Sequence, residues 1–287
     1  MTESLDASVV ITAYNNAGTL GEQLDALAAQ RTTARWELII ADNGSTDGTA
    51  ALVDSRAAAF PVPLRRVDAS AVAGVPHARN AGVAAAVGSL ILFCDADDRV
   101  AEDWVEQGIR ALDGGADCAG GALRELRTPF DPGAPLLPRS AYVATARGGG
   151  VIGCNMVMRR SLLQELGGFD ETLPRYGGDD SEFSLRMNLA GARIIPAPDM
   201  VVYFRATTDP RQILRKVYLG SLAEVEIWRR HPELYAAQLE RGYLLWETLS
   251  LPRTLVAARR RGGNRALARQ AVRWAAHLRA GLGPRRH

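Results

Sequence analysis

Three aspartates follow a strongly apolar segment, and something must offset their charge. Asp95, Asp97 and Asp98 come directly after Leu90–Cys94 in the stretch LILFCDADD. An apolar run of this kind is typical of a buried strand, and carboxylates gathered at its end raise one another's pKa unless a cation compensates. Because residues i and i+2 of an extended chain point the same way, we expect Asp95 and Asp97 to share one hard cation, Mn²⁺ or Mg²⁺. The alternative is an ordinary turn, in which Asp is common.

A second polar cluster follows another apolar run. The stretch ADNGSTDGT, residues 41–49, combines a glycine-containing turn with hydroxyls and carboxylates and opens a helix. It lacks the glycine and lysine spacing of a P-loop, and no G-x-G-x-x-G follows any expected strand, which disfavours kinases, ATPases and dinucleotide oxidoreductases. Asp42 is instead placed to accept a hydrogen bond from a nucleobase or a ribose hydroxyl.

Two further clusters can complete a site. Arg79, in the stretch GVPHARNAG, is a donor for a phosphate or for Asp95, or else a solvated helix charge. Asp179 and Asp180, in GGDDSEF, stand at the start of an expected helix, where carboxylates interact favourably with the helix dipole. The functional alternative is that one of these two aspartates is a general base held across from the metal.

The elements that must position these residues form an α/β pattern. Continuous apolar runs at residues 7–14, 36–42 and 89–95 predict strands covered on both faces, and helical patterns between them predict a doubly wound sheet. Residues 113–150, rich in Gly and Pro, predict a strand and a long loop. Ligands of such sheets bind at the carboxyl ends of the strands, so the polar residues there should converge at one edge. The residues expected at that edge are Thr12, Ala13, Tyr14, Asn15, Asp42, Asn43, Asp95 and Ala96.

Composition bounds the class of protein. The 287 residues are 47% hydrophobic and 23% charged, as in a globular chain, with a net charge of +2. Residues 205–287 hold 17 Lys and Arg against 6 Asp and Glu, so the first 204 residues carry a net charge of −9. The three cysteines form no C-x-x-C motif, and neither a signal peptide nor an 18-residue apolar run is evident. We therefore expect a cytoplasmic protein.

The basic residues concentrate in the C-terminal segment, which has 10 Arg and no acidic residue after Leu251. The stretch NRALARQAVRWAAHLRAG predicts an amphipathic basic helix. Its two faces are formed by Arg265, Arg269, Arg273 and His277, and by Leu267, Ala271, Trp274 and Leu278. Such a helix can lie on an anionic membrane surface, here the inner face of the membrane. The alternative is a helix docked on its own domain with a solvated Arg face; no nucleic acid partner is expected.

Four stretches, in their order and spacing, resemble the nucleotide-sugar-dependent glycosyltransferases of family 2. The resemblance runs from Ser8 to Pro198 and is carried by VVITAYNNAGTLGEQLDAL, ELIIADNGSTDGT, ARNAGVAAAVGSLILFCDADDRV and GGFDETLPRYGGDDSEFSLRMNLAGARI. It implies the GT-A fold, a Rossmann-like mixed, mostly parallel sheet flanked by helices. It also implies inverting transfer of a sugar from a nucleoside diphosphate sugar donor to a hydroxyl of a glycan, glycolipid or small-molecule acceptor.

The resemblance also implies roles for individual residues. Asp42 matches the carboxylate that reads the nucleobase, and Asp95 and Asp97 match the D-x-D metal motif. Asp180 matches the aspartate of the family's Glu-Asp pair, the usual base, and Asp179 stands where Glu is more common. A cation at the D-x-D motif would stabilise the diphosphate leaving group while the base takes the proton of the acceptor hydroxyl.

These expectations define a domain organisation. We expect a GT-A catalytic domain at residues 1–205, with nucleotide-sugar binding in about 1–100 and the acceptor side in about 113–205, then a basic helical extension at 206–287. Many relatives carry a His shortly after the last core strand, where this chain has Tyr203, Phe204 and Arg205 instead. Either fewer protein ligands hold the cation, or this arginine supplies part of the charge. Two alternatives stay open: a nucleotidyltransferase on a related fold, and a non-catalytic protein that binds anionic surfaces through the Arg tail.

Overall fold

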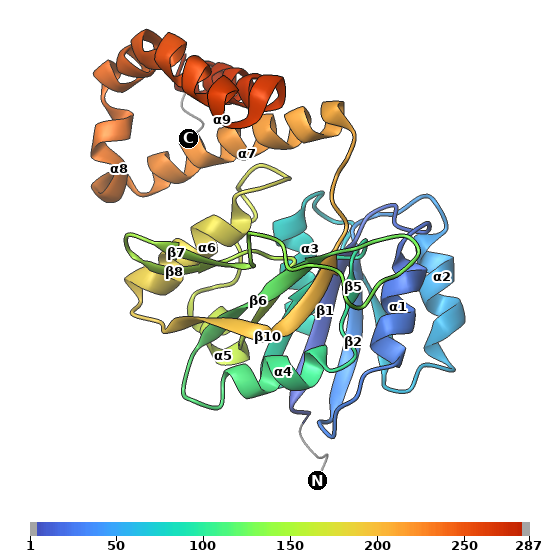
Figure 1. Cartoon of the computed structure of the whole chain (residues 1–287). Helices are drawn as coiled ribbons and strands as arrows, with labels where there is room; N and C mark the ends of the chain where they lie inside the picture. The colour runs from blue at the N-terminus through green and yellow to red at the C-terminus, as the bar shows by residue number, and fades with distance from the viewer. Residues whose placement is uncertain (1–4, 283–287) are drawn as a thin grey trace. The chain divides into compact units, whose positions relative to one another are not determined.

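The computed structural model describes residues 5–282 and contains an eight-stranded mixed sheet flanked by helices (Figure 1). Its first part runs β1 (Ala7–Ala13), α1 (Leu20–Ala28), β2 (Trp36–Asp42), α2 (Thr49–Ala57), β3 (Leu64–Asp68), α3 (Val75–Ala85) and β4 (Leu90–Cys94). This alternation is the one that the sequence predicts. The strands β1, β2 and β4 are buried over nearly their whole length, as continuous apolar runs require.

The second part of the sheet mixes strand directions. It comprises β5 (Arg99–Val100), α4 (Trp104–Ala111), β6 (Cys118–Glu125), β7 (Tyr142–Thr145), β8 (Gly148–Val151), β9 (Asn155–Arg159), α5 (Arg160–Glu165), α6 (Asp179–Leu189) and β10 (Ile194–Phe204). The strand order is β3-β2-β1-β4-β9-β6-β10-β5, with β9 antiparallel to β4 and β6, and β5 antiparallel to β10. The remaining pairs are parallel, which confirms the mixed, mostly parallel sheet.

The core lies on both faces of the sheet. On one face, Val9 and Ile11 of β1 pack in a cluster with residues of α1, α2 and α4. On the other face, Val10 packs in a cluster with residues of α5 and α6. Helix α3 approaches this second face closely, because a Cβ at Gly82 would overlap Cγ1 of Val10. That close approach fixes the helix that carries Arg79 against the sheet.

A hairpin formed by β7 and β8 occupies the region predicted as a long loop. The sequence conceals it because β8 begins with Gly148, Gly149 and Gly150, and glycine has low strand propensity. Gly149 is required because there is no room for a side chain: a Cβ there would lie 2.8 Å from atoms of Ile194 and Tyr142.

The chain forms two compact units. The first contains Met1–Glu171 and Asp179–Ala206, and the second contains Thr172–Gly178 and Thr207–His287. The second unit is built from α7 (Pro210–Arg230), α8 (Pro232–Leu239) and α9 (Arg241–Leu282), which confirms the C-terminal helical extension. The division of catalytic roles between residues 1–205 and 206–287 stays a prediction.

Helix α9 consists of two segments. Gly262 and Gly263 have non-helical backbone angles, and Gly263 has a φ of 63°, which glycine adopts without strain. Between residues 5 and 282, none of the helices combines the length and the hydropathy needed to cross a membrane.

Candidate active site

Asp95–Asp98 form a turn between β4 and β5. The chain from Asp95 to Asp97 is therefore not extended, contrary to the prediction from the sequence. Both side chains are half-buried at the end of β4, and their sharing of one cation stays a prediction. Asp98 is fully buried, and its Oδ1 accepts a hydrogen bond of 2.7 Å from the backbone N–H of Arg205. Its Oδ2 is buried with no hydrogen-bond partner among the described residues. The turn thus holds a concentration of negative charge.

The pKa of Asp95 is shifted by its burial and by the charges around it. The pKa of Asp95 is raised to about 6. Burial is the largest cause, and the charges of Asp97, Asp180 and Asp179 add to it, while Arg79 acts in the opposite direction. The aspartates from the end of β4 and from the start of α6 therefore lie close enough to interact electrostatically. The structure brings together the two acidic clusters that the sequence places more than 80 residues apart.

A thiol also lies at this cluster. Carboxylate oxygens of Asp95 and Asp98 and the sulfur of Cys154 lie within 4.8 Å of one another, close enough to hold a metal ion. Burial, followed by the charges of nearby aspartates, raises the pKa of Cys154 well above its usual value, so without a cation the thiol stays protonated. A protonated thiol is a weak ligand for Mg²⁺ or Mn²⁺, which prefer oxygen. The chemistry of the cluster therefore favours its carboxylates as the donors.

Arg79 forms a buried ion pair with Asp179, in which Nη1 donates to Oδ2. The guanidinium lies 5.3 Å from the ring centroid of Phe169. A Cβ at Gly153 would overlap Nη2 of Arg79, so this glycine makes room for the guanidinium. The sequence predicts a phosphate or Asp95 as the partner of Arg79, whereas its partner in the structure is Asp179. Direct contact between Arg79 and a bound donor stays a prediction.

Helix periodicity explains why Asp179 is buried. Asp179, Phe183 and Met187 stand at i, i+4 and i+8 of α6, on the face that packs against the sheet, and all three are buried. Asp180 points about 100° away and is half-buried. The apolar spacing of Phe183 and Met187 is a sequence signal that identifies Asp179 as the inward residue of the pair.

Among the contacts described, no arginine forms an ion pair with the carboxylate of Asp180. Its Oδ2 accepts a hydrogen bond of 3.1 Å from the N–H of Gly153, and its Oδ1 accepts one of 2.8 Å from the N–H of Ser181. Burial and the charge of Asp179 raise the pKa of Asp180, while Arg79 lowers it. The two adjacent aspartates therefore have different surroundings, and Asp180 is the one more exposed to solvent.

The ends of β1 and β2 lie side by side, as the topology predicts. Thr12 is in register with Ala41 and Ala13 with Asp42. The side chain of Asp42 is buried, and its Oδ1 accepts a hydrogen bond of 2.9 Å from the N–H of Ser45. The loop is therefore shaped around the carboxylate that we expect to read a nucleobase.

Of the other residues predicted at this edge, Tyr14 is exposed to solvent, whereas Asn15 and Asn43 form hydrogen bonds within the chain. Tyr14 is 61% exposed, and Asn15, with a φ of 55°, accepts a hydrogen bond of 2.8 Å from the N–H of Thr46. Asn43 uses its amide within the chain: it donates to the carbonyl of Val72 at 2.9 Å and accepts from the N–H of Gly74 at 2.8 Å. Asn43 thus shapes the loop before α3, and its contact with a ligand stays a prediction. Ala96 is buried in the turn.

Arg205 binds the aspartate turn from the end of β10. Its Nε donates to the backbone carbonyl of Asp97 at 2.7 Å, and its Nη2 pairs with Glu22 at 2.6 Å. From α1, Gln23 donates to the carbonyl of Asp95 at 3.0 Å and accepts from the N–H of Val100 at 2.9 Å. The sequence singled out Arg205 but not Glu22 or Gln23, because polar residues in an amphipathic helix carry no local signal of a distant partner.

The sequence profile of glycosyl transferase family 2 matches residues 8–167, and that of the N-terminal domain of galactosyltransferase matches residues 140–207. The chain belongs to glycosyltransferase family 2. It is 24% identical over 238 residues to glycosyltransferase AglE of Haloferax volcanii, covering 79% of this chain and 76% of that protein. It is 28% identical to the pre-mycofactocin glycosyltransferase of Mycobacterium tuberculosis over 86% of this chain and 53% of that protein. It is 36% identical to YfnE, an uncharacterized glycosyltransferase of Bacillus subtilis, over 107 residues. The match covers 37% of this chain and 27% of YfnE.

Solved structures share the fold of this glycosyltransferase. The mannosyltransferase PcManGT from Pyrobaculum calidifontis, in complex with GDP-Man and Mn²⁺, has a TM-score of 0.69 at 21% identity, covering 97% of this chain and 88% of that one. S. aureus TarS 1-349 in complex with UDP has a TM-score of 0.57 at 18% identity, covering 96% of this chain and 91% of that one. The predicted family, the GT-A fold and the enzyme class are confirmed. The nucleotidyltransferase and non-catalytic alternatives are set aside.

Proposed function

We propose that this glycosyltransferase transfers a sugar from a nucleoside diphosphate sugar to an acceptor hydroxyl, with inversion at the anomeric carbon and with the assistance of Mn²⁺ or Mg²⁺. The observation that carries the proposal is the division of roles between the two aspartates that open α6. Asp179 is buried and paired with Arg79. Asp180 is half-buried and accepts hydrogen bonds from the N–H groups of Gly153 and Ser181 and, at 3.4 Å, from the hydroxyl of Ser181, with no guanidinium among the partners described.

Asp180 is the proposed general base. A base works best when its pKa is moved toward the operating pH, and burial raises the pKa of Asp180. The N–H groups of Gly153 and Ser181 orient its carboxylate. Asp180 accepts the proton of the acceptor hydroxyl as the hydroxyl oxygen attacks the anomeric carbon on the face opposite the diphosphate. The acceptor is a glycan, a glycolipid or a small molecule.

The donor site is proposed at the ends of β1, β2 and β4. Asp42 accepts a hydrogen bond from the nucleobase or the ribose, and the loops after Ala13 and Asp42 enclose the nucleotide. The complexes of PcManGT with GDP-Man and of TarS with UDP support a nucleoside diphosphate donor. Both proteins share only the fold with this chain, so the identity of the sugar rests on experiment.

The residues of the turn fit a divalent cation. Asp95 and Asp97 offer the oxygen ligands that Mn²⁺ and Mg²⁺ prefer, and Asp98 keeps one buried oxygen without a hydrogen bond among the described residues. Burial and then the charges of neighbouring carboxylates raise the pKa of Asp95, and a cation would offset those charges. A metal bound there stabilises the negative charge of the departing diphosphate. Arg205 holds the turn in place through the Asp97 carbonyl.

A thermal-shift screen tests the donor and the cation together. The purified chain is heated with each nucleoside diphosphate sugar, with and without Mn²⁺; a ligand at 100 times its Kd stabilises by roughly 2.7 kcal/mol. We expect stabilisation by one nucleobase series and only with the cation. The anomeric configuration of the product, read by NMR, then tests inversion. Retention of configuration, or release of pyrophosphate from a nucleoside triphosphate and a sugar 1-phosphate, would contradict the proposal.

A further inference from the structure

The first segment of α9 exposes large apolar side chains on one side. Leu245, Trp246, Leu249 and Val256 are between 53% and 72% exposed. These four residues form one surface with Arg253, Arg259 and Arg260, which are also exposed. We call this surface the outer face of α9. Soluble proteins rarely leave apolar residues clustered in this way without a partner.

Helix geometry makes the cluster a stripe. At 3.6 residues per turn, Leu245, Leu249 and Val256 lie within about 40° of one another around the helix axis. Arg253 and Arg260 lie along one side of this stripe. The apolar and basic side chains also meet in the structure, in a shallow groove lined by Pro252, Arg253, Val256, Ala257, Arg260 and Arg261.

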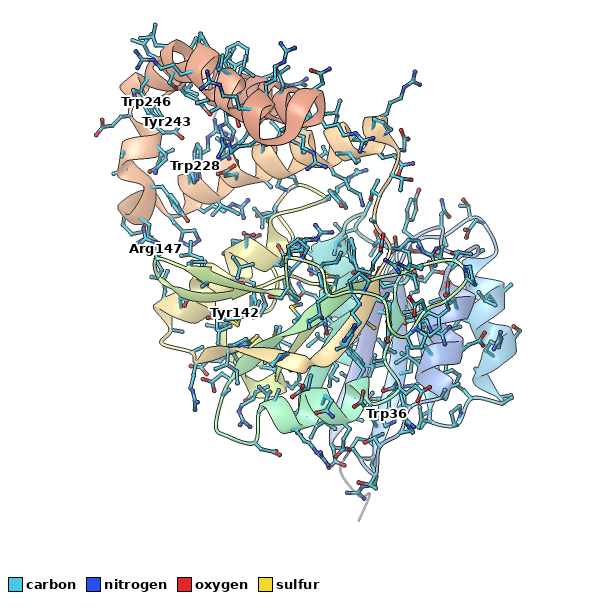
Figure 2. The ribbon with its side chains drawn as sticks, viewed as in Figure 1. Trp36, Tyr142, Arg147, Trp228, Tyr243 and Trp246 are labelled. Carbon is cyan, nitrogen blue, oxygen red and sulfur yellow. The ribbon has the colours of Figure 1, made fainter. Side chains whose placement is uncertain are left out.

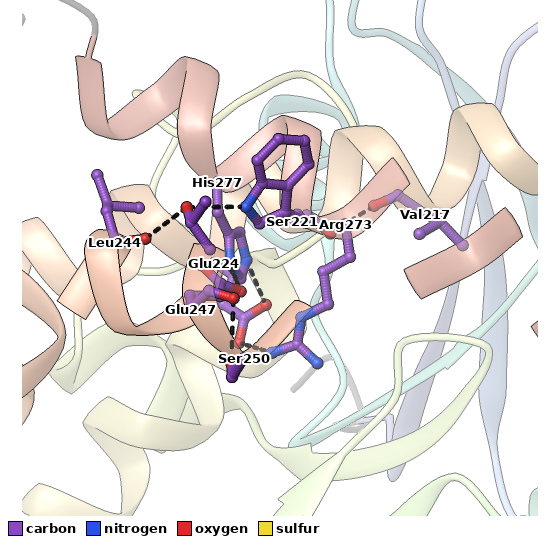
Figure 3. A network of polar contacts seen from close by, with 10 residues as sticks. Val217, Ser221, Glu224, Leu244, Glu247, Ser250, Arg273 and His277 are labelled. Atoms are coloured by element: carbon purple, nitrogen blue, oxygen red, sulfur yellow. Dashed lines mark hydrogen bonds and ion pairs between the residues drawn. The ribbon is translucent and has the colours of Figure 1, made fainter. Parts of the chain in front are cut away.

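The sides of the segment that face away from the stripe are already occupied inside the second unit. Glu247 accepts from His277 at 2.9 Å (Figure 3). Thr248 accepts from Nε1 of Trp274 at 3.2 Å. Ala258 is buried on this inward side. The aromatic rings of Trp228, Tyr243 and Trp246 form a series that leads from α7 to the outer face (Figure 2). These contacts fix the orientation of the segment within the second unit, so that the outer face points away from the unit's interior.

Charge identifies the kind of partner. From residue 248 to the end of the chain the sequence contains no Asp or Glu. The stripe of Leu and Val flanked by Arg, with a Trp at its margin, matches the two zones of an anionic bilayer surface, where apolar side chains enter the acyl boundary and Arg and Trp remain among the headgroups. A symmetric contact between two copies would instead bring like charges together. We propose that the outer face of α9 binds an anionic phospholipid bilayer.

This surface differs from the one that the sequence predicts. The sequence points to residues 264–281, with His277 on an exposed basic face and Leu267 and Trp274 on the apolar face. In the structure His277 is fully buried, and Leu267 and Trp274 are half-buried. The prediction for His277 was wrong because Glu224 and Glu247 bind its two ring nitrogens.

Vesicle sedimentation tests the proposal. The full chain is mixed at physiological ionic strength with vesicles of phosphatidylcholine alone, or of equal parts phosphatidylcholine and phosphatidylglycerol. We expect binding to the anionic vesicles only. Each arginine at an anionic surface strengthens partitioning about fivefold, so Arg253→Gln with Arg260→Gln should weaken it about 30-fold. Leu245→Ser with Leu249→Ser should weaken it about tenfold or more.

Two matched controls separate this face from general effects. Arg265→Gln with Arg269→Gln removes the same charge from exposed positions in the other segment of α9. Val87→Ser with Leu189→Ser removes two exposed apolar side chains of the first unit. Both controls should bind as the unaltered chain does. Equal weakening by the first control would show undirected charge attraction and overturn the proposal, as would the absence of binding to anionic vesicles.

Tryptophan fluorescence locates the contact. Of the five tryptophans, Trp36, Trp104 and Trp228 are buried, Trp274 is half-buried and Trp246 is 62% exposed. Brominated phospholipids in the anionic vesicles should quench the emission of the full chain, and Trp246→Phe should remove most of that quenching. Quenching that persists in Trp246→Phe would place the contact elsewhere. A stable dimer in solution that Leu245→Ser with Leu249→Ser dissociates would assign the face to a second copy of the chain.

Discussion

The ion pair between Arg79 and Asp179 joins α3 to the first turn of α6, and both of its side chains are almost completely buried. It links the part of the chain expected to bind the donor to the part expected to bind the acceptor. Because Asp179 offsets the charge of Arg79, the neighbouring Asp180 keeps a carboxylate available for chemistry. A structural ion pair and a proposed base thus occupy successive positions of one helix.

Asp179→Asn should destabilise the fold. The substitution leaves the guanidinium of Arg79 buried without a carboxylate, which costs about 3 to 5 kcal/mol. Urea unfolding measures the change in the free energy of unfolding. The control is Arg79→Met combined with Asp179→Leu, which removes both charges and should recover much of the loss, because apolar replacements of buried pairs are often neutral. A cost well below that of a buried charge would mean that water reaches the pair.

Asp180→Asn should abolish most of the activity without unfolding the protein. Asparagine keeps the shape and one of the two hydrogen bonds from the N–H groups of Gly153 and Ser181, because its amide has a single acceptor oxygen. It takes no proton from the acceptor hydroxyl, so turnover should fall about 10² to 10⁴-fold. Donor affinity, measured by calorimetry, should stay nearly unchanged. Asp179→Asn, compared at equal folded fraction, should slow turnover less. The reverse order would make Asp179 the base, and an unchanged rate in both variants would place the base outside α6.

Asp97→Ala should remove the metal-dependent part of nucleotide binding. The side chain of Asp97 is half-buried, and the turn is held through its backbone carbonyl by Arg205, so the fold should survive its truncation. Titration of a nucleoside diphosphate with and without Mn²⁺ gives the two affinities. We expect that Mn²⁺ no longer improves binding in the variant. Binding as tight as that of the unaltered chain in Mn²⁺ would remove Asp97 from the metal site.

Arg205→Met should weaken the same metal-dependent binding by loosening the turn. The guanidinium makes one contact with the Asp97 carbonyl and one with Glu22, a geometry that a single ammonium group does not reproduce. Arg205→Lys should therefore recover only part of the affinity. The expected loss is about tenfold, since two charged hydrogen bonds contribute about 1.5 to 3 kcal/mol each and are partly replaced by water. An unchanged affinity in Arg205→Met would show that the turn is held by Gln23 and Asp98 alone.

The sequence predicts the strands and the shared edge of the sheet because both follow from local pattern and topology. Continuous apolar runs identify β1, β2 and β4, and parallel strands place their carboxyl ends together. The partner of Arg79 is not local: it lies 100 residues away, and several carboxylates compete for one guanidinium. Only the packing of α6, which turns Asp179 inward with Phe183, selects it. The inward orientation of His277 has the same origin, since its partners belong to other segments of the second unit.

The stability of the second unit should depend on pH through His277. This side chain is fully buried, its Nδ1 lies 2.9 Å from Glu247 and its Nε2 lies 3.2 Å from Glu224, which also pairs with Arg273 at 2.8 Å (Figure 3). Burial alone would lower the pKa of His277, but the two glutamates outweigh it and raise the pKa above 6.5. The protonated ring is therefore the form that the folded unit favours.

A raised folded-state pKa fixes the sign of the pH dependence. The stabilisation is fully present below the unfolded pKa of about 6.5 and is lost as the pH rises through the folded-state value. We expect urea unfolding, followed by the fluorescence of Trp228, whose ring lies 5.0 Å from that of His277, to need less denaturant as the pH rises from about 6 to 9. His277→Gln should be less stable at the lower pH and should lose this slope. A variant that keeps the slope would assign it to groups other than the imidazole.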